Sequence, residues 1–430
     1  MKRKKSKLGR IIKGNRGLSI YIICIVALFA YLVIRIIPEK KTLLTRETLL
    51  RTSPGVAYVF RQEDYAVIFS EIPITFDIGE GEKISAATLL TDDVNITTDK
   101  YTNEKLSAIS LLRGEMGLSS SALYKHISDL REQIAVCRGK LLLDAGNEAE
   151  KSTLENLKQS LNTAKIALSY LGLSNYELQV TEENLRASLG AVLPLTAQNL
   201  NFSQYGNITY NLDGYESEMG MDDLMGVSGE YLDKLSSMAP VIMDIEGRYT
   251  VKSIAADRLV VVIRASSQSV LSKEEDALKM YEQCCANRDM SEFGGYFGFL
   301  FDRIDLLNMF PTLRFYDANN KEYSGKLVQV EKTDTEKFYY IAIRKNVSAY
   351  NDIRIFSCDV TEASYDCYVA DKSCLYQIGQ EYYVDITTGG ALRSVTEVFP
   401  LSITEQKVYF QRSENPSLYE GAELFLKGGK

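Results

Sequence analysis

The stretch that decides the fold of this chain is residues 121–172, which read SALYKHISDLREQIAVCRGKLLLDAGNEAEKSTLENLKQSLNTAKIALSYLG. Apolar residues recur there at alternating steps of three and four, in two series separated by a short polar stretch. A narrow apolar seam at heptad spacing is typical of a helix that packs against one partner helix. The seam consists of Ile127, Leu130, Ile134, Leu141, Leu154, Leu157, Leu161 and Leu168.

The polar stretch between the two series predicts how the helices are arranged. Asp144–Asn147 is too short for the second helix to do anything but return beside the first. We therefore expect an antiparallel helical hairpin, roughly 30–35 Å long at about 1.5 Å per residue. The alternative is a pair of ordinary amphipathic helices in an unrelated core, and the flanking sequence has to decide between them.

A basic segment followed by an apolar segment opens the chain. Residues 1–16 are rich in Lys and Arg, and residues 17–34 carry no charged side chain. With Arg35 and two isoleucines added, the apolar stretch reaches the roughly 20 residues that span a bilayer. No small-residue cleavage site follows, which favours an uncleaved anchor. We expect a cytoplasmic tail at 1–16, a transmembrane helix at 17–37 and an extracytoplasmic remainder, a single-pass protein of the cell membrane.

The composition argues against several classes of function. The net charge is −8, although the first residues are basic, so the exported part is acidic and nucleic-acid binding is not expected. His126 is the one histidine, which leaves little for a catalytic triad or a metal site, and no Cys-x-x-Cys pair occurs. Asp92–Asp93 and Asp222–Asp223 would attract Ca²⁺, but neither continues into an EF-hand pattern. We expect no enzyme, no metal and no cofactor.

Short β-like blocks stand on both sides of the helices. Before them, apolar residues alternate over 74–78 and Gly81 permits a tight turn. After them, apolar residues alternate over 208–212, and Asp213–Gly214 is a hairpin turn signal. These blocks look like the two halves of one small β domain that the helices interrupt.

In their motifs, the blocks resemble the halves of a biotinyl/lipoyl-like domain. Split by a helical hairpin and placed behind one N-terminal anchor, they resemble the HlyD-type membrane fusion proteins, or periplasmic adaptor subunits, in the single-anchor form of Gram-positive bacteria. The resemblance implies a mainly β fold with an inserted α-helical coiled-coil hairpin. The implied domains are the first lipoyl-like half at 52–96, a helical region at 97–199 with its coiled coil at about 121–172, the second lipoyl-like half with a helical decoration at 200–240, a β-barrel at 241–360 and a membrane-proximal β domain at 361–430.

The resemblance also bears on the hairpin tip. Family members that dock onto an outer-membrane channel carry an Arg–Leu–Ser pattern there. Arg138 and Leu142 match its first two positions, whereas Ala149 stands at the third, which agrees with a Gram-positive type. The alternative is that Arg138 is a solvated residue on the flank of the coiled coil.

By this resemblance, the chain is a non-enzymatic adaptor of an export or efflux complex. Its implied partners are a membrane transporter of ABC type, the bilayer through the anchor, and further copies of itself, with the hairpin projecting outward. The alternative is a membrane-anchored scaffold of the cell envelope that has no transport partner.

Overall fold

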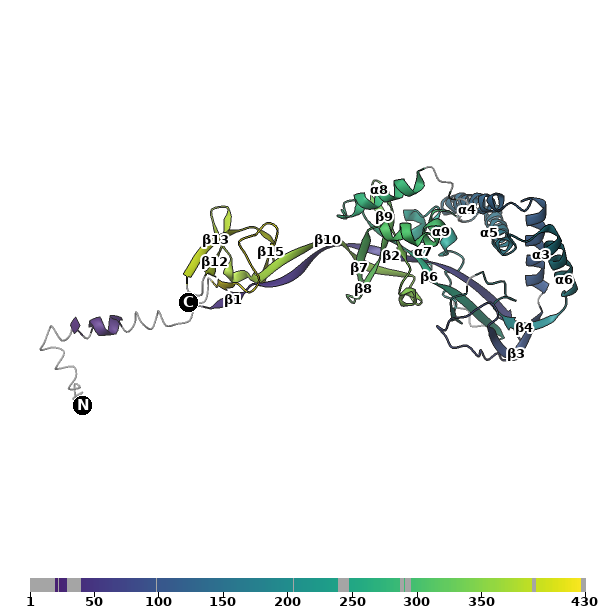
Figure 1. The fold of residues 1–430 in the computed structure, drawn as a ribbon, viewed down its shortest axis with the longest axis horizontal. Coiled ribbons are helices and arrows are strands. Elements are labelled where there is room, and N and C mark those ends of the chain that lie inside the picture. The colour runs from purple at the N-terminus through teal and green to yellow at the C-terminus, as the bar shows by residue number, and fades with distance from the viewer. Residues whose placement is uncertain are drawn as a thin grey trace. The chain divides into compact units, whose positions relative to one another are not determined.

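The computed structural model describes residues 20–21, 23–28, 40–97, 99–203, 205–238, 247–286, 290, 295–388 and 392–426. The chain divides into two compact units. One contains residues 1–50 and 364–430, and the other contains residues 51–363. Both are predominantly β, and the second unit also carries the helices α3–α10 (Figure 1).

The described strands are β1 (Lys41–Leu43), β2 (Thr45–Phe69), β3 (Leu89–Thr97), β4 (Val192–Thr196), β5 (Asn207–Thr209), β6 (Arg248–Ser266), β7 (Thr312–Asp317), β8 (Glu322–Lys332), β9 (Glu336–Ile343), β10 (Ile355–Asp371), β11 (Tyr376–Ile378), β12 (Glu381–Thr388), β13 (Leu392–Val398), β14 (Pro400–Ile403), β15 (Lys407–Gln411) and β16 (Glu423–Phe425). The described helices are α3 (Asp99–Gly114), α4 (Ser120–Leu143), α5 (Glu148–Leu168), α6 (Asn175–Ala187), α7 (Gly229–Ser237), α8 (Glu274–Cys285), α9 (Tyr296–Asp302) and α10 (Ile304–Met309), with short 3₁₀ turns η1 (Met221–Leu224), η3 (Val347–Tyr350) and η4 (Lys372–Cys374).

A barrel forms the centre of the larger unit. Its strands follow the order β10-β2-β6-β9-β8-β7, and a pairing between β10 and β7 closes the ring. Strand β6 shows why the sequence builds a barrel with a covered wall. Its run Leu259–Ile263 is apolar without a break, and alternate residues enter two different hydrophobic cores. A strand with both faces buried needs such a continuous run.

Helices cover the outer face of this wall. Residues of α7, α8, α9 and α10 enter the same core as Val260 and Val262 of β6. The sequence interpretation placed the helical stretch after Met221 on the second lipoyl-like half, and here the structure differs. Tyr231, Leu232 and Leu235 are apolar on one helical face, and the apolar surface available to them is the barrel wall.

The two lipoyl-like blocks meet although the whole helical region lies between them in the sequence. The amide of Gly81 donates to the carbonyl of Ile208 at 2.8 Å, and that of Ile84 donates to Gly206 at 3.0 Å. Gly81 has a φ of +83°, as its tight turn requires. A separate core unites the blocks: Ala66, Ile68, Ile74, Ile84, Leu90, Ile96, Leu195, Ala197, Leu200, Phe202, Ile208 and Val251.

The boundaries of this small domain differ from the expected 52–96 and 200–240. Residues 55–61 of β2 pair with 259–265 in the barrel wall, and only the later part of β2 reaches the lipoyl-like core. Strand β6 also serves both, because its residues 248–254 pair with that later part of β2. The two runs read from the sequence as separate short strands, 56–60 and 65–69, are one strand with a register shift between Arg61 and Glu63.

Strands β3 and β4 flank the helical region and pair with each other, so that Thr97 lies opposite Val192. Between them, α3, α4, α5 and α6 gather into one group (Figure 1). The group has its own core, distinct from those of the barrel and of the lipoyl-like domain. The helical region is therefore an insertion that enters and leaves at one point.

The smaller unit contains β1, β11–β16 and the adjoining ends of β2 and β10. β1, β16, β12, β11 and β13 form one sheet, and β14 and β15 extend β10. Its core is a single cluster that includes Leu44, Val384, Phe410 and Leu424. The unit spans nearly the range expected for a membrane-proximal domain, with the addition of residues 40–50.

Most of the expected anchor at 17–37 and all of the basic tail at 1–16 lie outside the described residues. Residues 20–21 and 23–28 are described and are helical. Among the described helices, none is both long enough and apolar enough to cross a membrane.

Candidate interaction site

The helical hairpin is formed by α4 and α5. Ser119 caps the first helix and Asn147 caps the second, each accepting a backbone hydrogen bond through its side chain. All eight seam residues lie in one core cluster, to which α3 adds Ala108, Ile109 and Leu112 and α6 adds Leu178. The seam therefore faces a group of four helices rather than a single partner helix.

The hairpin does not stand free of the rest of its unit. Its tip end lies against the barrel, where Leu142 packs beside the core that α7 and α9 cover. Figure 1 shows α4 reaching toward these helices. The flank of the hairpin is therefore held by contacts within the chain, whereas residues 143–146 at its tip are exposed, and the outward projection of that tip stays a prediction.

Four cationic side chains make the principal polar contact between the hairpin and the barrel. They stand seven residues apart on each helix: Arg131 and Arg138 on α4, Lys158 and Lys165 on α5. Seven residues are about two helical turns, so each pair shares a helical face. We call these four residues the cationic face.

The cationic face holds residues 217–223, a segment that we call the acidic segment. At one end, Lys165 donates to Asp222 at 2.9 Å, and Arg131 Nε donates to the same carboxylate at 2.7 Å. At the other end, Arg138 and Lys158 both donate to the carbonyl of Ser217, at 3.2 and 3.1 Å. Arg131 and Lys165 share Asp222, and Arg138 and Lys158 share Ser217. The earlier cation of α4 therefore lies beside the later cation of α5, as expected for antiparallel helices.

Two further carboxylates complete the contact. Arg138 pairs with Asp223 at 2.6 Å, and Lys158 donates to Glu218 at 3.2 Å. The Arg138 guanidinium also lies over the ring of Tyr231, 5.4 Å from its centroid. Arg138 is 6% exposed, so it is neither a solvated flank residue nor available to a distant partner in this conformation.

The acidic segment is also attached to the barrel, through apolar packing and a backbone hydrogen bond. Met219 and Leu224 are buried in the barrel's outer core, and the carbonyl of Met219 accepts from the amide of Arg61 at 3.1 Å. The amide of Gly220 donates to Asp223 at 2.8 Å, which shapes the turn. Apolar residues of the segment thus enter the barrel core while the acidic residues between them meet the hairpin.

The electrostatics of the contact favour the charged forms of Asp222 and Glu218, whereas burial raises the pKa of Asp223 despite its pairing with Arg138. Burial opposes ionisation of Asp222, but Lys165 and Arg131 outweigh that cost and hold the pKa of Asp222 well below its usual range. Burial likewise opposes ionisation of Glu218, and Lys158, Arg138 and Lys234 together lower the pKa of this carboxyl. Neither Asp222 nor Asp223 is left to a calcium ion, since both are matched by cations of the hairpin.

A close backbone approach accompanies the ion pairs. Gly226 has a φ of +88°, and a Cβ built on it would lie 2.7 Å from the Cβ of Ala135 on α4. Only glycine fits there without displacement of the helix. The remaining expected tip residue, Ala149, is exposed in the first turn of α5.

Asp213, expected in a hairpin turn, has a different position. Gly214 has the positive φ of a tight turn, +81°, but the chain does not return as a strand. The Asp213 carboxylate instead accepts from Arg61 at 2.8 Å, from Arg354 at 2.8 Å and from Lys252 at 3.2 Å. Glu63 and Glu216 balance the remaining charge of these cations.

This second cluster joins the barrel to the lipoyl-like domain. Arg61 has no exposed surface, and burial together with the neighbouring Arg354 lowers the pKa of Arg61 to about 10. Burial opposes the charge on Asp213, but Arg354, Lys252 and Arg61 hold the pKa of its carboxyl far below the usual range. The cluster locks the register shift in β2 in place, because Arg61 and Glu63 flank that shift.

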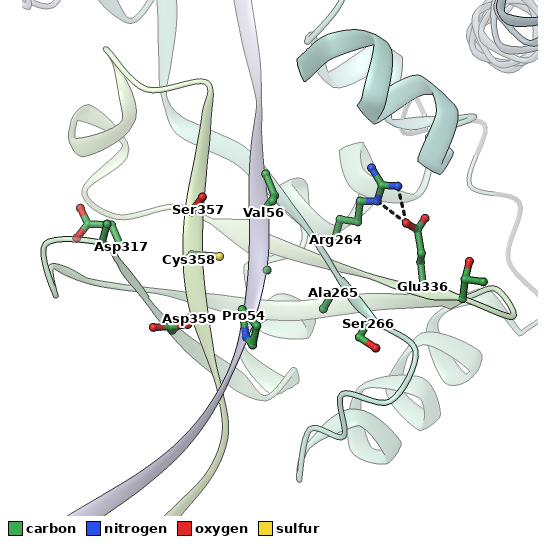
Figure 2. A pocket seen from close by; sticks show the side chains of 13 residues that line it. Pro54, Val56, Arg264, Ala265, Ser266, Asp317, Glu336, Ser357, Cys358 and Asp359 are labelled. Atoms are coloured by element: carbon green, nitrogen blue, oxygen red, sulfur yellow. Dashed lines mark hydrogen bonds and ion pairs between the residues drawn. The ribbon is translucent and has the colours of Figure 1, made fainter. Parts of the chain in front are cut away.

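A groove of about 610 Å³ opens beside β2 and β10, where Pro54–Val56 faces Ser357–Asp359 (Figure 2). Arg264 and Glu336 lie at one side and are already paired, with Arg264 Nε donating to Glu336 at 2.7 Å. Burial raises the pKa of the Cys358 thiol to about 12, which leaves it unreactive at neutral pH. The groove therefore offers no catalytic constellation.

Within the described part of the chain, no group of three or more His, Cys, Asp or Glu side chains is placed to hold a metal ion. His126 lies half-buried on α4. All seven cysteines fall in the described residues, and none forms a disulfide there.

Comparison with known proteins finds likenesses in structure alone. No family model matches the sequence. No curated protein matches it either. Among solved structures, the chain is similar to MacA from Actinobacillus actinomycetemcomitans, with 10% identity, coverage of 90% of this chain and 98% of that one, and a TM-score of 0.26.

Two further similar structures are of a membrane fusion protein and of a periplasmic adaptor protein. One is the membrane fusion protein Spr0693 from Streptococcus pneumoniae R6, with 11% identity, coverage of 72% and 99%, and a TM-score of 0.24. The other is the periplasmic adaptor protein EmrA, with 10% identity, coverage of 74% and 99%, and a TM-score of 0.21. The chain is similar to membrane fusion proteins.

Proposed function

We propose that this chain is the adaptor subunit, a membrane fusion protein, of an export complex, and that it acts by holding partners rather than by catalysis. The observation that carries the proposal is the split lipoyl-like domain. Its two blocks pair through Gly81, Ile84, Gly206 and Ile208 across an inserted group of helices, beside a closed barrel. Such a framework presents surfaces to binding partners, and its described residues include no group of His, Cys, Asp or Glu side chains placed to hold a metal ion.

The partner that this role requires is a polytopic membrane transporter, and we propose one of ABC type. The anchor at 17–37 places the chain in the same bilayer, with the tail at 1–16 in the cytoplasm and the two β units outside. Several copies of the chain would surround one transporter. The sequence supports this topology through its basic tail and the uncharged stretch that follows.

The first test is co-purification. The full chain, cross-linked and solubilised gently from its native membrane, is expected to carry a polytopic transporter with it. Repeated recovery without a transporter would instead favour the cell-envelope scaffold. Topology is tested with protease on intact, wall-stripped cells: residues after Pro38 should be degraded, while a tag before Lys2 stays protected.

The pairing of β3 with β4 allows the helical region to be deleted without loss of either strand. Thr97 and Val192 are paired neighbours on β3 and β4, so residues 98–191 can be replaced by an Asn-Gly turn that closes a β-hairpin. The shortened chain should still co-purify with the transporter, since its barrel and its smaller unit keep their cores. Export should be abolished, because the helices are the proposed distal contact. Full export by this variant would contradict the adaptor role of the helices.

A further inference from the structure

The contact between the hairpin and the barrel has the composition of an exchangeable interface. Each side retains a complete hydrophobic core of its own, one within α3–α6 and one beneath α7 and α9. What joins them is mainly charge: Arg131, Arg138, Lys158 and Lys165 against Glu218, Asp222 and Asp223. Separation of the hairpin from the barrel would uncover Leu142 but leave both cores otherwise intact, as at polar interfaces between domains.

The cationic face is also a built recognition site. Its four side chains come from two helices at matched spacing. They converge on the carboxylates of one short segment and on one of its backbone carbonyls. The Nε of Arg138 is buried without a hydrogen-bond partner, and its nearest carboxylate, that of Glu218, lies 4.0 Å away. The face therefore retains an unused donor toward a peptide that already fills it.

We propose that the cationic face is a binding site for an acidic peptide segment, and that residues 217–223 occupy it in cis. A partner protein with an acidic segment of the same kind would take this site and free the hairpin from the barrel. The recognition chemistry is that of carboxylates about four residues apart, preceded by a backbone carbonyl, that of Ser217 here, which accepts from Arg138 and Lys158. This goes beyond the proposed export role and does not depend on which transporter is bound.

The occupant in cis can be removed by isosteric substitutions. In the full chain, Glu218→Gln, Asp222→Asn and Asp223→Asn together keep the shape of the segment and remove its three negative charges. The hairpin should then leave the barrel. Acetylation of lysines by an N-hydroxysuccinimide ester, followed by mass spectrometry, measures this directly, because Lys158 and Lys165 are 20% and 26% exposed in the closed state.

Lys151 is the internal control for this measurement. It is 49% exposed and pairs only with Glu148 on its own helix, so its rate of acetylation should be the same in both proteins. Lys158 and Lys165 should react at least fivefold faster in the triple variant than in the wild type. Unchanged rates at both lysines would overturn the proposal that the acidic segment holds the hairpin.

Binding in trans tests the recognition itself. The probe is a fluorescent peptide with the sequence of residues 215–224, YESEMGMDDL. It should bind the triple variant at least tenfold more tightly than the wild type, whose site is filled. Adding Arg138→Gln and Lys158→Gln to the triple variant should abolish binding, and a peptide with Gln and Asn in place of its acidic residues should not bind. Equal binding to wild type and triple variant would refute a cis-occupied site.

Should the triple variant fail to fold, as judged by circular dichroism, the single change Asp222→Asn replaces it. Asp222 accepts from Lys165 and Arg131, whereas Lys158 donates to Ser217 and Glu218. Acetylation of Lys165 should then rise while that of Lys158 stays low. A rise at neither lysine would overturn the proposal, and it would leave the export role untouched, since that role is judged by co-purification.

Discussion

Arg61 donates a hydrogen bond of 2.8 Å to Asp213, a residue 152 positions later in the chain, and the guanidinium that does so has no exposed surface. The pair joins the barrel strand β2 to the end of the lipoyl-like domain. Lys252 and Arg354 donate to the same Asp213 carboxylate. Asp213 thus links cations of β2, of β6 and of the residue before β10 within the larger unit.

Asp213→Ala leaves three buried cations with two carboxylates between them. Loss of one partner from a buried ionic cluster costs about 3–5 kcal/mol. Urea denaturation of the full chain, followed by circular dichroism, should show this loss in the transition of the larger unit. The control is Asp305→Ala, which breaks an exposed pair with Arg303 and should cost less than about 1 kcal/mol. Similar losses in the two variants would contradict the central role of Asp213.

Gly226→Ala should weaken the contact between α4 and the barrel. Its new methyl group would meet Ala135, and the residue would also be held at a positive φ. Gly81→Ala is the matched comparison, since its φ is +83° and no atom lies within 4 Å of the added Cβ. Backbone strain alone costs roughly 1 kcal/mol. We expect Gly226→Ala to be the more destabilising by thermal denaturation, and Ala135→Gly to restore part of the difference.

Leu161→Ala tests the separateness of the helical core. Leu161 is 6% exposed, and its loss should cost about 2–5 kcal/mol. The loss should be confined to α3–α6, as measured by hydrogen exchange, while the barrel strands keep their protection. Leu143→Ala at the exposed tip should change nothing, since Leu143 is 87% exposed. Equal loosening of the barrel by Leu161→Ala would show that the helices share its core after all.

Acid should release the hairpin. The pKa of Asp222 is lowered in the folded protein, because Lys165 and Arg131 outweigh the effect of burial. A depressed pKa contributes stability that is complete above the unfolded value of about 4 and is lost as the pH falls toward the folded value. Acetylation cannot report at low pH, so the readout is hydrogen exchange. The protection of residues 217–228, taken relative to the intrinsic exchange rate at each pH, should fall as the pH drops from about 5 toward 3. Asp222→Asn should reduce this pH dependence, and an unchanged profile would exclude Asp222 as its source.

Local patterns predicted much of this structure, and long-range pairing of charges accounts for what they missed. The seam from Ile127 to Leu168 and the turn at Gly81 follow from periodicity and from the freedom of glycine, both of which are visible in a few residues. The ion pairs of Arg138 with Asp223 and of Arg61 with Asp213 link residues far apart, and no local pattern indicates them. A signal for the first was present: cations recur at seven-residue spacing on both helices, and an Asp-Asp pair stands unexplained downstream.

The boundaries were missed for a related reason. Strand β2 looks like two strands in the sequence because charged residues interrupt its apolar run at Arg61 and Glu63. In the structure Asp213 pairs with Arg61 and Arg354 pairs with Glu63, so the strand continues through these charges. Charged residues that interrupt an apolar run indicate a turn, unless buried partners of opposite charge allow the strand to continue.

The position of β2 in the chain has a consequence for biogenesis. This strand emerges early during synthesis, but its neighbours β6 and β10 begin only at Arg248 and Ile355. Until they arrive, β2 presents unpaired backbone groups, and unpaired edges of this kind promote aggregation. The helices α3–α6, whose core needs only residues between Ala108 and Leu185, can be complete long before then. The interval before β6 and β10 are synthesised is therefore the stage at which β2 most needs protection from aggregation.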